Sequence, residues 1–132
     1  MLMVKGVRGA ITVASNEAGQ IVDATQSLLH HMIDANGIEE DFVASVMFTT
    51  TPDLDAAYPA KGARLLGWER VALMGFQEMD VPNGLAKCIR ILIHWNTTKT
   101  LDEINHIYLG DAVSLRPDLK NKNRLPLNGT KE

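Results

Sequence analysis

The chain has 132 residues, 45% of them hydrophobic, which is ordinary for a globular protein with one domain and one core. Its formal net charge is -3, and acidic and basic residues are interspersed, so nothing in the sequence resembles the basic face of a nucleic-acid binder. We therefore expect no nucleic-acid partner.

The first predicted elements are a strand and a long helix. Residues 1–13 read as a strand, in which Gly6 and Gly9 mark a bulge or a close backbone approach. The helix that follows can be capped by Ser15 or Asn16, and Gly37 is its expected C-terminal stop. Apolar spacing predicts that one stripe of this helix faces the core: Ile21, Thr25, Leu28, Leu29, Met32 and Ile33.

The middle of the chain predicts strand, short helix, strand and loop. Residues 42–50 form a second strand, and a short helix begins at Pro59 and ends at Gly67. Residues 70–74 form a third strand, and residues 75–84 a loop.

The last elements begin with the most apolar strand, residues 88–95. A helical turn with a capping-type start follows at residues 100–103, and a fifth strand at residues 106–109. The segment 120–132 has almost no apolar content, so we expect a mobile polar tail.

The N-terminal apolar residues are interrupted by Lys5 and Arg8, which argues against a secretory signal, and no run approaches the ~20 residues of a membrane span. Cys88 is the only cysteine, so an intrachain disulfide is excluded. Its place at the start of an apolar strand is typical of a small buried hydrophobe rather than a nucleophile. We expect a cytoplasmic protein with no membrane partner.

Two arginines lie inside apolar strands, Arg90 in the run 88–93 and Arg8 in the run 7–13. A guanidinium stays protonated, so burying it without an anion costs roughly several kcal/mol. Two interpretations follow and remain open at this point. Each arginine forms an internal ion pair with one of the 16 carboxylates, or the two bind an anionic ligand.

The common catalytic and metal motifs are missing. His30 and His31 are helix neighbours pointing about 100° apart, and strand pairing of His94 with His106 is weak support for a zinc site. There is no glycine-rich phosphate loop and no serine in a nucleophile elbow. If the chain is an enzyme, we expect no metal, no cofactor and no covalent catalysis.

Seven segments carry a family resemblance over residues 4–119, in this order: Lys5 to Val13 (Lys-Gly-Val-Arg-Gly-Ala-Ile-Thr-Val), Thr51 to Leu54 (Thr-Pro-Asp-Leu), Tyr58 to Lys61 (Tyr-Pro-Ala-Lys), Gln77 to Val81 (Gln-Glu-Met-Asp-Val), Cys88 to Arg90 (Cys-Ile-Arg), His106 to Leu109 (His-Ile-Tyr-Leu) and Leu115 to Leu119 (Leu-Arg-Pro-Asp-Leu). Together they resemble the small monofunctional chorismate mutases of the trimeric α/β class, not the all-helical class. The resemblance implies an α/β (α+β) fold, in which one long and several shorter helices pack on a mixed sheet of about five strands. It also implies a single domain over residues 1–119 and a trimeric pseudo-barrel with active sites between subunits.

The resemblance implies that the chain converts chorismate to prephenate in phenylalanine and tyrosine biosynthesis. This [3,3] sigmatropic rearrangement needs neither a nucleophile nor a proton transfer, which accounts for the missing motifs. The protein must instead hold a flexible dianion in its reactive conformer and stabilise the charge that develops as the C–O bond breaks.

By resemblance, Arg90 contacts the ether oxygen, where negative charge grows, and also a substrate carboxylate. Arg8 and Tyr108 bind the side-chain carboxylate. Glu78 accepts a hydrogen bond from the ring hydroxyl, and its charge favours the electron-poor ring fragment of the transition state. An ion pair between Glu78 and Arg90 in the empty site is compatible with this role.

The remaining expected substrate-binding residues fall into three groups. The neighbouring chain contributes Tyr58, Ala60, Lys61 and Arg64, the C-terminal segment contributes Leu115 and Arg116, and the set is completed by Met74, Gly75, Phe76 and Gln77. For Tyr58 the alternative is ordinary packing at the start of its helix. On sequence alone, a solvated helix face accounts for Lys61 and Arg64 at least as well. Gly75 departs from the small polar or thiol side chain of the family, so a backbone N–H or water must replace any contact made there.

Two other functions stay open. One is a non-catalytic trimeric module that binds a small carboxylate with the same arginines. The other is the superficially similar trimeric enamine/imine deaminase fold, which lacks this pattern of segments. Fold alone does not separate these functions, so the site residues must do so.

Overall fold

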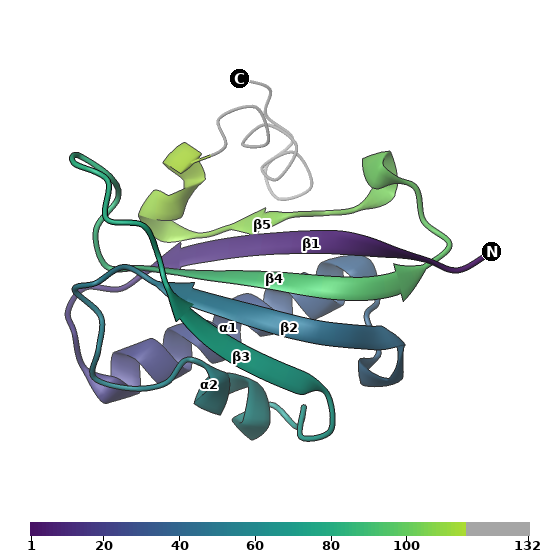
Figure 1. Ribbon diagram of the computed structural model, residues 1–132, viewed down its shortest axis with the longest axis horizontal. Helices are drawn as coiled ribbons and strands as arrows, with labels where there is room; N and C mark the ends of the chain where they lie inside the picture. The colour runs from purple at the N-terminus through teal and green to yellow at the C-terminus, as the bar shows by residue number, and fades with distance from the viewer. Residues whose placement is uncertain (116–132) are drawn as a thin grey trace.

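The computed structural model describes residues 1–115. These residues form one five-stranded mixed sheet in the order β3-β2-β4-β1-β5 (Figure 1). The strands are β1 (Met3–Thr12), β2 (Val43–Thr50), β3 (Ala72–Gln77), β4 (Cys88–Thr97) and β5 (Ile107–Tyr108). β4 pairs antiparallel with β1 and β2, whereas β5 pairs parallel with β1, and β3 parallel with β2.

Two α-helices, α1 (Ala18–Asn36) and α2 (Ala60–Leu65), lie on one face of the sheet (Figure 1). Short 3-10 turns cover Glu40–Phe42, Leu101–Glu103 and Gly110–Leu115. The expected α+β fold, with about five strands, one long helix and shorter helices, is confirmed. Among the described residues, neither α-helix has the length and hydrophobicity that crossing a membrane requires. The expected tail 120–132, the domain end at residue 119 and Arg116 lie outside the described residues.

Some predicted element boundaries are wrong. The helix α1 begins at Ala18, and its N-cap residue, Glu17, makes no side-chain capping hydrogen bond. The predicted cap Asn16 is used elsewhere, because its Oδ1 accepts hydrogen bonds from the backbone N–H groups of Asp55 and Ala56. The predicted loop 75–84 begins too early, since β3 continues to Gln77 in register with β2. Pairing with a neighbouring strand outweighs the low strand preference of a glycine at position 75. Other signals are confirmed, among them the stop at Gly37, with φ 72°, and the capping box of Thr100 with Glu103.

Gly9 is a point of close approach rather than a bulge. A Cβ there would lie 2.5 Å from Met32 Sδ and 3.1 Å from Leu28 Cδ1. β1 pairs with β4 without a register shift from Met3 to Thr12, and the irregularity lies in β2, between Val43 and Ser45. Only glycine lets α1 pack this close to β1.

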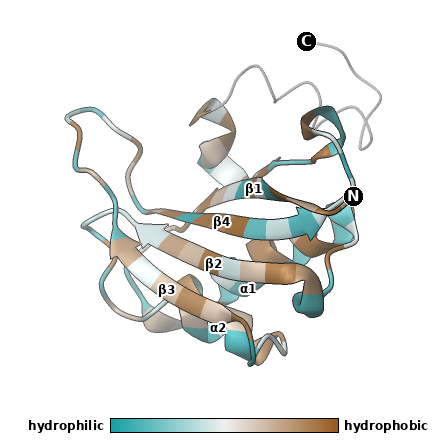
Figure 2. Ribbon diagram, turned by 45° about the vertical axis from the view of Figure 1, so that its right-hand side comes forward, coloured by the Kyte–Doolittle hydropathy of each residue, from teal (hydrophilic) through white to brown (hydrophobic). Residues whose placement is uncertain are grey.

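The core lies between the sheet and α1. Side chains of β1, β2 and β4 meet the predicted helix stripe, which is buried except for a partly buried Ile33. The strand contribution consists of Val7, Val46, Phe48, Ile91 and Ile93. Figure 2 shows β4 as hydrophobic over most of its length and hydrophilic towards its carboxyl end.

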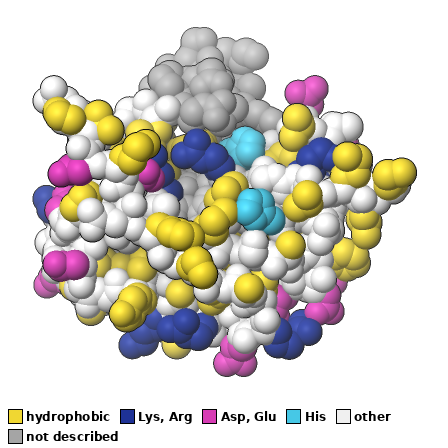
Figure 3. All heavy atoms as spheres, viewed as in Figure 1, with side chains coloured by type: hydrophobic (Ala, Val, Ile, Leu, Met, Phe, Trp, Pro, Cys, Tyr) yellow, Lys and Arg dark blue, Asp and Glu magenta, His cyan; other side chains and the backbone are white. Residues whose placement is uncertain are grey.

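The face of the sheet opposite α1 and α2, here called the open face, also carries apolar side chains. Met74 and Phe76 of β3 are 61% and 46% exposed there. Figure 3 looks onto this face and shows hydrophobic side chains gathered beside arginine or lysine and histidine side chains. An apolar surface of this kind is typical of a subunit contact.

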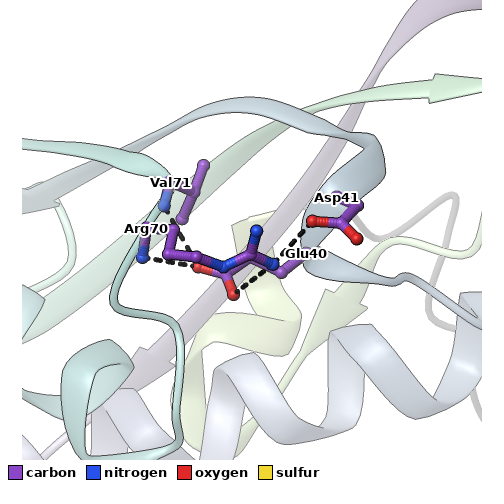
Figure 4. Close-up of polar contacts among 4 residues, drawn as sticks. All are labelled: Glu40, Asp41, Arg70 and Val71. Carbon is purple, nitrogen blue, oxygen red and sulfur yellow. Dashed lines mark hydrogen bonds and ion pairs between the residues drawn. The ribbon is translucent and has the colours of Figure 1, made fainter.

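The edge strand β3 is anchored by a charged cluster at its start (Figure 4). The Glu40 carboxylate accepts from the N–H groups of Arg70 and Val71 at 2.8 and 3.0 Å. The Arg70 guanidinium lies 3.3 Å from Glu40 and 2.6 Å from Asp41. The pKa of Glu40 is lowered, mainly by the hydrogen bond from the backbone N–H of Arg70. Burial acts in the opposite direction, and the hydrogen bond from the Val71 N–H and the charge of Arg70 lower the pKa further. This cluster fixes the strand that leads to Glu78.

Candidate active site

A row of directly paired residues crosses the open face of the sheet. Phe76 of β3 pairs with Thr49 of β2, which pairs with Arg90 of β4. Arg90 pairs with Ala10 of β1, and Ala10 with Tyr108 of β5. Directly paired residues present their side chains on the same face, and strands lie about 4.8 Å apart, so the backbones of Arg90 and Tyr108 are roughly 10 Å apart. Ala10 between them contributes only a methyl group.

Glu78 is the residue that directly follows β3, and it lies beside this row. Its N–H donates to Thr50 O at 2.8 Å, which continues the alignment with β2 by one residue. Its Oε2 lies 3.3 Å from Arg90 Nη1, and the two side chains are 20% and 27% exposed. The pairing that sequence reasoning allowed for the empty site is therefore present. At this burial the pair is shielded from solvent more than a surface salt bridge is.

Two buried polar atoms in the row have no hydrogen-bond partner among the described residues: Arg90 Nε and Tyr108 Oη. Tyr108 is only 4% exposed. An unsatisfied buried donor costs about 1–3 kcal/mol, and native proteins carry few of them. Two such donors on one face, one of them in the half-buried guanidinium of Arg90, fit a site that receives an acceptor-rich anion.

Arg8 occupies the next row, where it pairs with Leu92 of β4. Its backbone N–H donates to His106 Nδ1 at 3.0 Å, and within residues 1–115 its side chain forms no ion pair. The two strand arginines thus differ. Arg90 has a carboxylate partner, whereas the Arg8 guanidinium is available to an anion from outside the described chain.

Two hollows meet at the Arg90–Glu78 pair. One of about 200 Å³ is lined by Arg8, Thr49, Phe76, Glu78 and Arg90, among others. The other, of about 310 Å³, lies between Glu78, Arg90, the turn at Thr51 to Asp53 and the loop from Met79 to Ala86. The first is smaller than a usual ligand site and the second is at the lower limit of the usual range, and both open to the surface.

Cys88 is the first residue of β4 and lies close to this site, but its thiol is buried. Burial raises the pKa of Cys88, and the nearby Arg90 and Arg8 offset this only in part. A thiol held protonated is a poor nucleophile, in agreement with the predicted role as a small hydrophobe.

The other residues expected at the site have several placements. Met74 lies on the open face but lines neither hollow, and Gly75 and Gln77 alternate to the other side of β3. Leu115 packs against the cluster of Ala10, Cys88, Tyr108 and Ala112. Within one chain, neither hollow is lined by the four residues expected from a neighbouring chain: Tyr58, Ala60, Lys61 and Arg64. Arg116 lies outside the described residues.

Sequence reasoning missed Thr49 and the structural role of Asp53. Strand alternation in residues 42–50 puts Thr49 on one face with Met47, but only the pairing with β4 puts that face beside Arg90. Asp53 accepts from the Thr51 hydroxyl at 2.5 Å and the Lys87 N–H at 2.9 Å. Burial raises the Asp53 pKa, but these hydrogen bonds outweigh it and leave the pKa lowered.

No group of three metal-ligand side chains comes together within residues 1–115. His94 bonds Ser45 Oγ at 2.9 Å, and His106 accepts from Arg8, so each of these rings has a protein partner. The chemistry of the described site is that of an anion receptor in which one carboxylate, Glu78, is paired with Arg90.

Comparison with known proteins shows the family to which the chain belongs. The family described as chorismate mutase type I matches residues 4–119. "Chorismate mutase AroH" of Thermus thermophilus is 47% identical over 119 residues, 89% of this chain and 98% of the relative. "Chorismate mutase AroH" of Bacillus subtilis is 42% identical over 119 residues, 89% of this chain and 94% of the relative. The solved structure of a chorismate mutase from Clostridium thermocellum has a TM-score of 0.83 and 50% identity, covering 84% of this chain and 99% of that one. The chain therefore belongs to the type I chorismate mutase family.

Proposed function

We propose that the Arg90–Glu78 site binds chorismate and rearranges it to prephenate without a cofactor. Family membership makes the chain a chorismate mutase, an isomerase of aromatic amino acid biosynthesis. The observation that carries the assignment to this site is the row of Arg90, Ala10 and Tyr108, with unsatisfied buried donors at both ends. A dianionic substrate supplies the acceptors that these donors lack in the described chain.

Arg90 binds the ether oxygen and one carboxylate of the substrate. Its planar guanidinium presents several N–H groups in a fixed fork, so one side chain serves two acceptors at once. Negative charge grows on the ether oxygen as the C–O bond breaks, so this contact strengthens in the transition state and lowers the barrier. Arg8 and Tyr108 bind the side-chain carboxylate, and this holds the flexible substrate in its compact reactive form.

Glu78 accepts a hydrogen bond from the ring hydroxyl. Its carboxylate stands at the junction of the two hollows and is already fixed to Arg90 at 3.3 Å. On substrate binding, Arg90 exchanges part of this contact for the substrate, and the negative charge of Glu78 favours the electron-poor ring fragment. Gly75, which offers no side chain, leaves its backbone N–H or a water to replace any contact there.

The protein acts as a homotrimer with each site shared by two chains. The exposed apolar side chains of the open face, Met74 and Phe76 among them, support burial against a second copy. In the assembly Tyr58, Ala60, Lys61 and Arg64 of one chain line the neighbour's site. Tyr58 is 82% exposed in the single chain, and Lys61 and Arg64 are also exposed, so these side chains are free to meet another subunit. Leu115 and Arg116 complete the site, and the cytoplasmic location stays a prediction.

The test is loss of chorismate absorbance on adding the purified protein. Arg90→Ala is expected to lower turnover by at least about 10²- to 10³-fold, the range for one preorganised oxyanion donor. Arg90→Lys keeps the charge but loses the planar fork, so we expect it to restore little. Near-normal turnover by Arg90→Lys contradicts the two-acceptor role of Arg90. Chorismate binding without turnover by the wild-type protein supports the alternative of a non-catalytic carboxylate-binding module.

A further inference from the structure

Thr49 contacts the same carboxylate oxygen that Arg90 contacts. Its hydroxyl donates to Glu78 Oε2 at 3.1 Å, and Arg90 Nη1 lies 3.3 Å from that oxygen. The other oxygen, Oε1, accepts from the Met79 N–H at 3.2 Å. The Glu78 carboxylate therefore has two partners that are neutral and one that is charged.

Substrate binding is expected to affect these three contacts to Glu78 differently. In the proposed function Arg90 turns to the substrate, so its contact with Oε2 weakens at the moment when the orientation of Glu78 matters. The backbone N–H of Met79 holds only Oε1, and rotation about that contact leaves Oε2 free to swing. Thr49 sits on a central strand paired on both sides, with β3 and β4, so its Oγ1 is fixed in space by the sheet.

We infer that Thr49 is a positioning residue for the reaction: its hydroxyl keeps Glu78 aimed at the ring hydroxyl of the substrate while Arg90 engages the substrate. This inference rests on the proposed function of the Arg90–Glu78 site. A β-branched hydroxyl residue suits the task, because its χ1 angle is restricted in a strand and the donor is held with little entropy loss. Thr49 also lines the hollow that contains Arg8 and Arg90, where the proposed function places the substrate.

The experiment compares Thr49→Val, Thr49→Ser and Thr50→Val with the wild type in steady-state chorismate turnover. Thr49→Val keeps the shape and removes the donor, so we expect kcat/KM to fall about tenfold or more, mainly through kcat, as for loss of a hydrogen bond to a charged group. Thr49→Ser restores the donor, so we expect it to lie within about threefold of the wild type.

Thr50→Val is the matched control. Thr50 is the next residue of β2, its side chain lies on the other face, and its hydroxyl donates to Leu54 O at 3.3 Å rather than to Glu78. Only the backbone carbonyl of Thr50 contacts Glu78, and this substitution leaves it in place. We expect Thr50→Val to change stability but to leave kcat and KM within about twofold of the wild type.

A double-mutant cycle with Glu78→Ala separates positioning from a general effect on the fold. If Thr49 acts through Glu78, adding Thr49→Val to Glu78→Ala lowers kcat less than about twofold further, because the group it positions is gone. An equal loss in both backgrounds overturns the inference, and so does Thr49→Val turnover within about twofold of an active wild type. A wild-type protein that binds chorismate without converting it overturns the proposed function instead, and this inference with it.

Discussion

Gly62 of α2 packs closely against the backbone of α1, and we predict that Gly62→Ala destabilises the protein although alanine is the better helix former. A Cβ at Gly62 would lie 2.8 Å from Val22 O and 3.0 Å from both Gln26 N and Thr25 Cβ. Ordinary contacts of a Cβ begin at 3.4 Å, so α2 must move away from α1 by about 0.6 Å at its nearest point. Two of the three atoms belong to the α1 backbone, which cannot rotate out of the way.

The size of the effect follows from two opposing terms. Overpacking a buried contact costs about 1–3 kcal/mol, and replacing glycine by alanine in a helix returns up to about 1 kcal/mol. With the full offset the net loss in the free energy of unfolding is centred on about 1 kcal/mol, which corresponds to a fall of roughly 3–6 °C in Tm for a chain of this length. Ala60, Lys61 and Arg64 lie on α2, so we also expect KM for chorismate to rise in the proposed shared site.

Gly19→Ala is the matched control, since Gly19 lies in α1 and its added Cβ meets nothing within 4 Å. It is expected to stabilise the protein by about 0.5 kcal/mol. Denaturant unfolding of both variants and the wild type is measured at one protein concentration, because self-association makes apparent stability depend on concentration. If Gly62→Ala is as stable as Gly19→Ala, the helix contact is not tight, and the reasoning is refuted.

The other predictions concern the shared site, the absent cofactor and the anchor of β3. Refolding inactive Arg90→Ala with inactive Arg64→Glu in equal amounts should return up to about a quarter of wild-type turnover, because about a quarter of all interfaces in a random mixture keep both faces intact. Mixed trimers without turnover contradict a shared site, and if Arg64→Glu alone is active the pairing is made with Lys61→Glu. Turnover should survive exhaustive chelation and thiol alkylation, since neither a metal nor Cys88 is assigned a chemical role, and loss restored by one metal ion contradicts this. Glu40→Gln should be less stable than the wild type at pH 7, with the difference shrinking as pH falls below 4.5, the ordinary pKa of the group. The sign follows from the lowered folded-state pKa, since the stabilisation is present while the carboxylate is ionised and is lost on protonation; a difference that grows in acid contradicts the role of the cluster in Figure 4.

The sequence determined the features that depend on neighbouring residues. The stripe of α1 follows from the helical repeat of apolar residues, the stop at Gly37 from the left-handed conformation that glycine tolerates, and the turn at Thr100 from its capping box with Glu103. The apolar run around Arg90 indicated a buried strand with an anion requirement, and the motif resemblance predicted site roles for Glu78, Arg8 and Tyr108. Each of these inferences uses residues within a few positions of one another in the sequence, or compares short segments with the motifs of the family.

The tertiary structure alone decided which of these segments meet. Backbone hydrogen bonds pair strands with little regard to side-chain identity, so neither the order β3-β2-β4-β1-β5 nor its register is written in any single segment. That order places Thr49 beside Arg90, with Ala10 and Tyr108 completing the row, and it extends β3 through Gly75 to Gln77. The same holds for Asn16, which the capping preference of asparagine predicts as a helix N-cap. Its side chain instead accepts hydrogen bonds from backbone N–H groups 39 and 40 positions away, because the fold brings those donors to it.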